Sequence, residues 1–167
     1  MEKLNVGAKK LGLYLTPHQL EQFHIYYQEL IDWNQRMNLT AITDYEEVQI
    51  KHFLDSLTVT QALKQPVDSE SFHLIDVGTG AGLPGVPLKI LLPDVKLVLL
   101  EATAKKAAFL AVASSSTSFI SGNRILSGIP GKPAPVPTSI RRKLSLFCFR
   151  ARVTVSESRK CFICTSS

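Results

Sequence analysis

The chain has 167 residues, a formal net charge of +5 and 45% hydrophobic residues. This length suits one domain with a sizeable core, and no apolar run approaches the roughly 20 residues of a membrane span. The stretch 1–12 is polar and mixed in charge, unlike a signal peptide. We therefore expect a cytoplasmic protein that does not enter a membrane.

The charge is distributed unevenly along the chain. Residues 1–110 hold 10 Lys/Arg and 13 Asp/Glu, whereas residues 111–167 hold nine Lys/Arg and one Glu. All three cysteines also lie after residue 110. Such a change in composition indicates a boundary. We predict a helical N-terminal part over 1–65, an α/β unit over 72–110 and an atypical basic tail over 111–167.

A first long helix is predicted to begin at Thr16-Pro17. Threonine serves as the N-cap and proline takes the first helical position, and apolar residues then recur at helical spacing as far as Ile31. Trp33 lies near the helix end. We interpret it as an anchor in the core of a small helical cap, and stacking on a nucleobase is the alternative.

A second helix is predicted from Thr43-x-x-Glu46, which has the spacing of a capping box. On this helix His52 and Asp55 are three residues apart and therefore share a face. The simplest interpretation of the pair is a local contact that orients the helix.

The rest of the chain is organised around a strand, a glycine turn and a helix. The apolar run 72–77 is typical of a buried parallel strand, and an apolar segment at 86–92 predicts a helix. Between them, Asp76 is followed by glycines at every second position: Gly78, Gly80 and Gly82. Glycine lets a ligand approach the backbone closely. The N–H groups at the helix start favour an electron-rich ligand.

The neighbouring residues narrow the ligand class. A dinucleotide fingerprint would need a glycine at Leu83, and a phosphate loop would need Lys and Ser/Thr after Gly85; neither is present. A second strand over 95–100 ends in Glu101, and one carboxylate can accept from both hydroxyls of a ribose. A nucleoside is therefore indicated, with a plain glycine turn of an α/β fold as the alternative.

A further helix is predicted from Thr103, which completes a β-α-β-α order with two parallel strands. Lys105 and Lys106 fall in its first turn, where the helix dipole disfavours cations. These lysines form either a solvated basic face or contacts to RNA phosphates.

The pattern changes after residue 110. Residues 114–118 are all Ser or Thr, and four prolines between 130 and 137 do not suit a regular strand or helix. Val153 and Val155 are compatible with a short strand. Cys161-x-x-Cys164 lacks the further ligands that a structural zinc site needs, so no metal site is expected.

The segment from Asp76 to Leu88 resembles the AdoMet loop of the RsmG (GidB) family, class I methyltransferases that modify N7 of a guanine in bacterial small-subunit ribosomal RNA. Further segments resemble the same family in order: Trp33-Asn34, Met37-Asn38-Leu39-Thr40, His52-Phe53-Leu54-Asp55-Ser56-Leu57, Leu100-Glu101-Ala102-Thr103, Lys105-Lys106 and Phe109-Leu110. The resemblance covers the chain from its N-terminus to about Leu110.

This resemblance implies a Rossmann-like doubly wound sheet with a helical N-terminal part, and S-adenosyl-L-methionine (AdoMet) as the cofactor. It implies a cofactor site formed by Asp76, Gly78, Gly80, Gly82, Leu83, Glu101, Ala102 and Thr103. Within this site, Asp76 is expected to support the loop. Contacts to the RNA or the target guanine are expected from His52, Asp55, Lys105 and Lys106. The implied partner is 16S rRNA or the small ribosomal subunit, bound by a monomer. No catalytic base is predicted, because guanine N7 already carries an available lone pair.

The family's Ala-Glu pair and Arg-Ala-Val-Ala stretch are absent after Leu110. We therefore expect an incomplete sheet, with only the first half of the AdoMet-binding domain over 72–110. One hypothesis is that residues from about 111 onward follow a shift of reading frame; the other is a genuine basic tail that binds RNA. Two further functions stay open: a non-catalytic AdoMet- or RNA-binding fragment, and a dinucleotide-dependent oxidoreductase.

Overall fold

The computed structural model describes residues 1–62, 72–116, 124–127, 154–155 and 161–166. Its helices are α1 (Glu2–Lys10), α2 (Pro17–Met37), α3 (Tyr45–Val48), α4 (Asp55–Thr58), α5 (Gly85–Leu91) and α6 (Ala104–Ser116). A π-helical segment, η1 (Gln49–Leu54), joins α3 to α4, and a 3-10 segment, η2 (Val59–Ala62), follows α4. The strands are β1 (Phe72–Val77), β2 (Lys96–Glu101), β3 (Arg124–Ser127), β4 (Thr154–Val155) and β5 (Cys161–Ser166).

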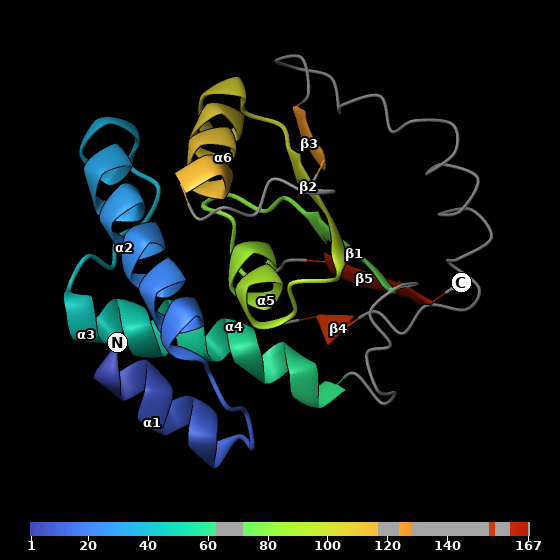
Figure 1. The fold of residues 1–167 in the computed structure, drawn as a ribbon. Helices are drawn as coiled ribbons and strands as arrows, with labels where there is room; N and C mark the ends of the chain where they lie inside the picture. Colours follow the sequence, from blue (N-terminus) through green and yellow to red (C-terminus); the bar gives the residue numbers. More distant parts are fainter. Residues whose placement is uncertain (63–71, 117–123, 128–153, 156–160, 167) are drawn as a thin grey trace.

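The described strands form one mixed sheet in the order β3-β2-β1-β5-β4 (Figure 1). The pairs β1–β2 and β2–β3 are parallel. Strand β5 is antiparallel to β1, and β4 is antiparallel to β5. The predicted α/β class and the parallel pairing of the first two strands are confirmed. Val77 is paired with Leu100, so the loops that follow β1 and β2 begin at the same edge of the sheet.

The helical part and the α/β part share one hydrophobic core. Helices α5 and α6 lie between the sheet and α2 (Figure 1). Fully buried Phe23 from α2 belongs to the same cluster as Leu97 from β2 and Phe109 from α6. The ring of Trp33 packs against Phe109 with centroids 6.0 Å apart. Trp33 therefore packs α2 against the α/β unit.

The start of α2 follows its sequence signal. Thr16 and Gln19 form a reciprocal capping box, and Pro17 takes the first turn. The Gln19 amide also donates to the carbonyls of Ile90 and Leu91, at 2.9 and 3.1 Å. The capping residue thus ties α2 to the end of α5.

The second helix begins one residue later than its signal. The N-cap is Asp44, whose Oδ1 accepts from the backbone N–H groups of Glu46 and Glu47. The predicted capping box at Thr43 was wrong because the carboxylate of the next residue takes both N–H groups. The helix then widens into η1, which the periodicity of apolar residues did not reveal.

Part of the predicted tail is regular structure. Helix α6 runs past Leu110 to Ser116, and residues 161–166 form β5 beside β1. The segment that contains Cys161 and Cys164 is rich in residues that favour strands, and it pairs with the free edge of β1. The proline-rich stretch 130–137 lies outside the described residues. Among the described helices, none combines the length and apolarity that a membrane crossing needs.

Candidate functional site

An open pocket lies where the glycine loop meets the second helix. Its volume is about 660 Å³. It is lined by Leu39, Thr40, Lys51, His52, Asp55, Ser56, Thr58, Val59, Gly78, Gly80, Ala81, Leu83, Pro84, Glu101 and Lys106. The pocket therefore sits outside the carboxyl ends of β1 and β2, the place where open α/β sheets bind ligands.

A second pocket, of about 820 Å³, lies between α1 and the α3–η1–α4 helix. It includes Val6 and Ile50, which are partly exposed apolar side chains. None of the glycine-loop residues lines it. We place the candidate site in the smaller pocket because the predicted ligand-binding residues converge there.

Asp76 supports the glycine loop from beneath. Its carboxylate is fully buried, and Oδ2 accepts from the Thr79 hydroxyl at 2.6 Å and from the Gly85 N–H at 3.0 Å. A Cβ on Gly85 would come within 2.9 Å of that oxygen, so only glycine fits there. Asp76 does not line the pocket. The Gly85 N–H, at the start of α5, is bound by Asp76. This N–H therefore does not face the ligand, contrary to the expectation for the start of the helix.

Glu101 holds the loop from the side of β2. Its Oε2 accepts from the Gly80 N–H and its Oε1 accepts from the Thr103 N–H, both at 2.9 Å. Glu101 is only 8% exposed but lines the pocket. Each carboxylate oxygen has two lone pairs, so the group can still accept from a ligand hydroxyl.

The three glycines of the loop have different roles. All have positive φ, at +72° for Gly78, +60° for Gly80 and +87° for Gly82. A Cβ on Gly78 would meet nothing within 4 Å, so its conformation alone demands glycine. A Cβ on Gly82 would lie 2.8 Å from Val86 and 3.1 Å from the Tyr26 hydroxyl. Gly82 is buried away from the pocket, and close packing explains it.

The opposite wall of the pocket comes from η1 and α4. His52 Nε2 lies 2.7 Å from the Thr40 hydroxyl, and the Thr40 N–H donates to Asn34 Oδ1 at 2.8 Å. Asn34, Thr40 and His52 thus link the end of α2 to the pocket. Within the described part of the chain, the Asp55 carboxylate has neither a hydrogen bond nor an ion pair. The side chains of His52 and Asp55 both line the pocket.

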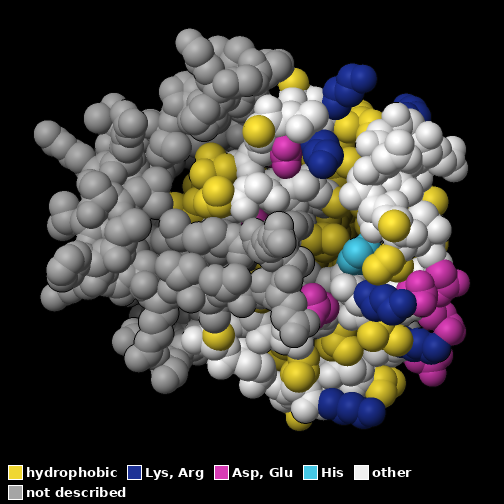
Figure 2. Space-filling view, turned by 180° about the vertical axis from the view of Figure 1, so that it is seen from behind, with side chains coloured by type: hydrophobic (Ala, Val, Ile, Leu, Met, Phe, Trp, Pro, Cys, Tyr) yellow, Lys and Arg dark blue, Asp and Glu magenta, His cyan; other side chains and the backbone are white. Residues whose placement is uncertain are grey.

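The lysines differ in their surroundings. Lys51 pairs with Glu47 at 2.6 Å and reaches the pocket rim. Lys106 lines the pocket, whereas Lys105 is exposed and does not. Lysine and arginine side chains on the face seen in Figure 2 are spread among acidic and uncharged ones.

The structure thus brings together seven of the predicted site residues: His52, Asp55, Gly78, Gly80, Leu83, Glu101 and Lys106. Asp76 and Gly82 support the loop from within, and Ala102, Thr103 and Lys105 are exposed outside the pocket lining. Sequence reasoning missed Thr40 and Val59 as lining residues. For Thr40 the signal was present, because the motif Asn38-Leu39-Thr40 interrupts the helical pattern. No group of three metal-ligating side chains occurs among the described residues.

Comparison with known proteins identifies the family. The sequence model of GidB, rRNA small subunit methyltransferase G, matches residues 19–129. A ribosomal RNA small subunit methyltransferase G from Dehalococcoides mccartyi is 48% identical over 151 residues, which are 90% of this chain and 62% of that protein. Proteins of the same name from Caldanaerobacter subterraneus and Lachnoclostridium phytofermentans are both 52% identical, over 66% and 62% of this chain and 45% and 42% of their own lengths.

The chain spans about half the length of these relatives. The match to the family model continues past Leu110 to residue 129. The motifs had placed the end of the resemblance at about Leu110, which was too early. A 151-residue alignment also has to extend beyond that point. With its partly parallel sheet and its glycine loop, the chain belongs to the GidB family, rRNA small subunit methyltransferase G.

Proposed function

We propose that this chain binds AdoMet in the candidate pocket and contributes to methyl transfer onto N7 of a guanine in 16S rRNA. One observation carries the proposal: the glycine loop after β1 and the acid that ends β2 line the same pocket as the helical segment that carries His52 and Asp55. The names of the relatives describe methyltransferases of the small-subunit rRNA.

The residues present suit the cofactor. The open space above Gly78 admits a ligand close to the backbone, and the Glu101 carboxylate is placed to accept from the ribose hydroxyls. Leu83 supplies an apolar surface at the pocket. We assign Ala102 and Thr103, which follow Glu101 in the chain, to the adenosine part. We assign Asp76 and Gly82 to support of the loop.

The proposed chemistry asks for positioning more than for acid–base catalysis. AdoMet, when bound, supplies the methyl group on a positively charged sulfur. Guanine N7 needs no deprotonation before it attacks, so the protein's task is to hold two reactants in line. The Glu101 and Asp55 carboxylates also provide negative charge beside a cationic ligand.

Asp55 is our candidate for recognition of guanine. Guanine presents N1–H and an exocyclic amino group on one edge and N7 on the opposite edge. A carboxylate on the helical wall can accept both N–H groups, which would turn N7 toward the glycine loop. His52, held by Thr40, borders the same space.

Lys105 and Lys106 are proposed to meet RNA phosphates at the pocket rim. Neither forms an ion pair among the described residues, so both amines are available for a polyanion. Monomeric RNA binding and a cytoplasmic location remain part of this proposal.

The test uses the 167-residue chain with S-adenosylhomocysteine, followed by isolated small subunits that lack the methylation. Binding of the nucleoside together with transfer of a labelled methyl group supports the proposal. Binding without transfer would favour the non-catalytic fragment. Binding of NAD instead would revive the oxidoreductase and overturn the proposal.

A further inference from the structure

A tyrosine of the helical part is bonded to the glycine loop. The Tyr26 hydroxyl, on α2, donates to the backbone carbonyl of Ala81 at 2.5 Å, across 55 residues of sequence. Tyr26 is fully buried, and Ala81 lines the candidate pocket. The bond therefore joins the core of the helical part to the surface that would meet the cofactor.

The phenol has little freedom to move. Its ring stacks on Phe53 with centroids 5.4 Å apart and an interplanar angle of 25°. Phe53 in turn packs against Phe23, with centroids 5.2 Å apart. On the loop side, the hydroxyl lies 3.1 Å from the place where a Cβ on Gly82 would stand. The Tyr26 side chain is thus held in place by its aromatic neighbours, and its hydroxyl packs closely against the glycine loop.

A buried hydroxyl loses its partner if the loop moves away. Water would have to enter the core, or the hydroxyl would stay unpaired at a cost in free energy. The bond to Ala81 therefore favours one conformation of the loop over others. Phenylalanine would fill the same space without this preference.

We infer that Tyr26 is a positioning residue that holds the glycine loop in its ligand-binding conformation. The inference rests on the proposed function only where it concerns cofactor affinity. The effect of Tyr26 on the conformation of the loop does not depend on any ligand. The helical N-terminal part thereby sets the affinity of a site built mainly by the α/β part.

The next residue along the chain supplies a matched control. Tyr27 also donates its hydroxyl to a backbone carbonyl, that of Thr43 at 3.2 Å, and also packs on an aromatic ring, that of Tyr45. Its contacts lie on the helical part and do not involve the glycine loop. Tyr26→Phe and Tyr27→Phe therefore remove the same atom from two different places.

The first measurement is hydrogen exchange of the ligand-free chain. The Gly82 and Leu83 N–H groups donate to the Thr79 carbonyl and report on the folded loop. We expect Tyr26→Phe to speed their exchange at least several-fold and Tyr27→Phe to leave it unchanged. Equal exchange in both variants would overturn the inference, whether or not the chain binds any nucleoside.

The second measurement is the dissociation constant of S-adenosylhomocysteine. We expect roughly a tenfold weakening in Tyr26→Phe and none in Tyr27→Phe. A third variant, Leu30→Val, shortens another fully buried side chain of α2 and is expected to lower stability while the Tyr26–Ala81 hydrogen bond is kept. If it weakens binding as much as Tyr26→Phe, Tyr26 has no positioning role. If neither the original chain nor any variant binds S-adenosylhomocysteine, the proposed function fails. The hydrogen-exchange result then still decides the role of Tyr26.

Discussion

The carboxylate of Glu101 accepts a hydrogen bond from the backbone N–H of Gly80, at 2.9 Å. The acid that ends β2 therefore fixes the loop that follows β1. One side chain can both shape the loop and meet a ribose.

Replacement of Glu101 should weaken binding of the cofactor. In Glu101→Gln, one of the two accepting carboxylate oxygens is replaced by an amide NH₂ group, which donates, and the negative charge is lost. We expect affinity for S-adenosylhomocysteine to fall by about 10- to 100-fold, since hydrogen bonds to charged groups contribute about 1.5–3 kcal/mol. Titration calorimetry measures this. The exposed Glu47→Gln is the control, and an unchanged affinity in Glu101→Gln would contradict the assignment.

Gly82→Ala should destabilise the fold more than Gly12→Ala. Both glycines have positive φ, +87° and +76°, so both variants carry backbone strain of about 1 kcal/mol or more. A Cβ on Gly12 meets nothing within 4 Å, whereas one on Gly82 meets Val86 at 2.8 Å. The clash should add about 1–3 kcal/mol. Denaturant unfolding checks the difference, and equal losses would contradict the packing argument.

Asp55→Asn should impair methyl transfer without a change in cofactor affinity. The carboxylate is proposed to accept from two N–H groups of guanine, and the amide can accept from only one. We expect kcat/KM for the small subunit to fall by about 10- to 100-fold. The exposed Asp32→Asn, which loses a surface ion pair with Arg36, is the matched control. Loss of nucleoside binding in Asp55→Asn would point to the cofactor instead of the guanine.

Tyr26 should make the fold sensitive to alkaline pH. Burial, and then the negative charge of Asp76, raise the pKa of Tyr26 above its ordinary value of 10.0. The protonated phenol is thus favoured in the folded state, and this contribution is complete below about pH 10. Above that pH it is lost, by up to about 1.4 kcal/mol per pH unit. Tyr26→Phe should flatten the fall in unfolding free energy between pH 9 and 11, and the exposed Tyr14→Phe should not.

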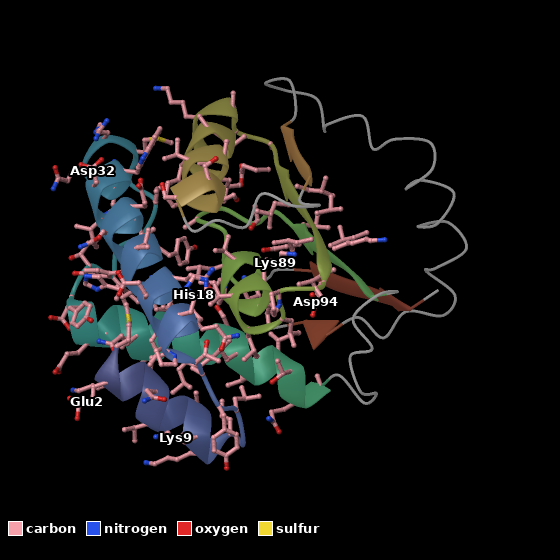
Figure 3. The ribbon with its side chains drawn as sticks, in the orientation of Figure 1. Glu2, Lys9, His18, Asp32, Lys89 and Asp94 are labelled. Carbon is pink, nitrogen blue, oxygen red and sulfur yellow. The ribbon has the colours of Figure 1, made fainter. Side chains whose placement is uncertain are left out.

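Lys89 should stabilise the turn between α5 and β2. The side chain is 4% exposed, and its Nζ donates to the carbonyls of Pro93 and Val95, both at 2.7 Å. Figure 3 shows Lys89 on α5 with Asp94 close to the following turn. Lys89→Met leaves the buried carbonyl of Val95 without this donor, and we expect a loss of about 1–3 kcal/mol. Lys96→Met, at the exposed first residue of β2, should change stability by less than about 0.5 kcal/mol.

Local signals in the sequence located the elements well. The Thr16-Pro17 cap, the apolar run 72–77 and the acid at Glu101 act over a few residues, and the structure confirms each of them. The seven site residues that converge in the pocket were likewise carried by short motifs.

Contacts between residues far apart in the chain could not be predicted from the sequence. The resemblance implied that Asp76 supports the loop, but the spacing of the glycines does not reveal its partners, Thr79 and Gly85. The pairing of β5 with β1 depends on an edge that only the assembled sheet presents. The helical periodicity placed Tyr27 on the apolar face of the first long helix. The structure instead buries Tyr26 fully and joins its hydroxyl to a loop 55 residues away.

The shared core has a consequence for how the chain is made. Tyr26 and Trp33 leave the ribosome well before Ala81 and Phe109, the residues they contact in the finished fold. Until then, α2 has an apolar face that is only partly covered by its own helical neighbours. A nascent chain arrested near residue 62 should therefore be a target for chaperones and proteases, and the helical part should gain protection only when α6 has emerged.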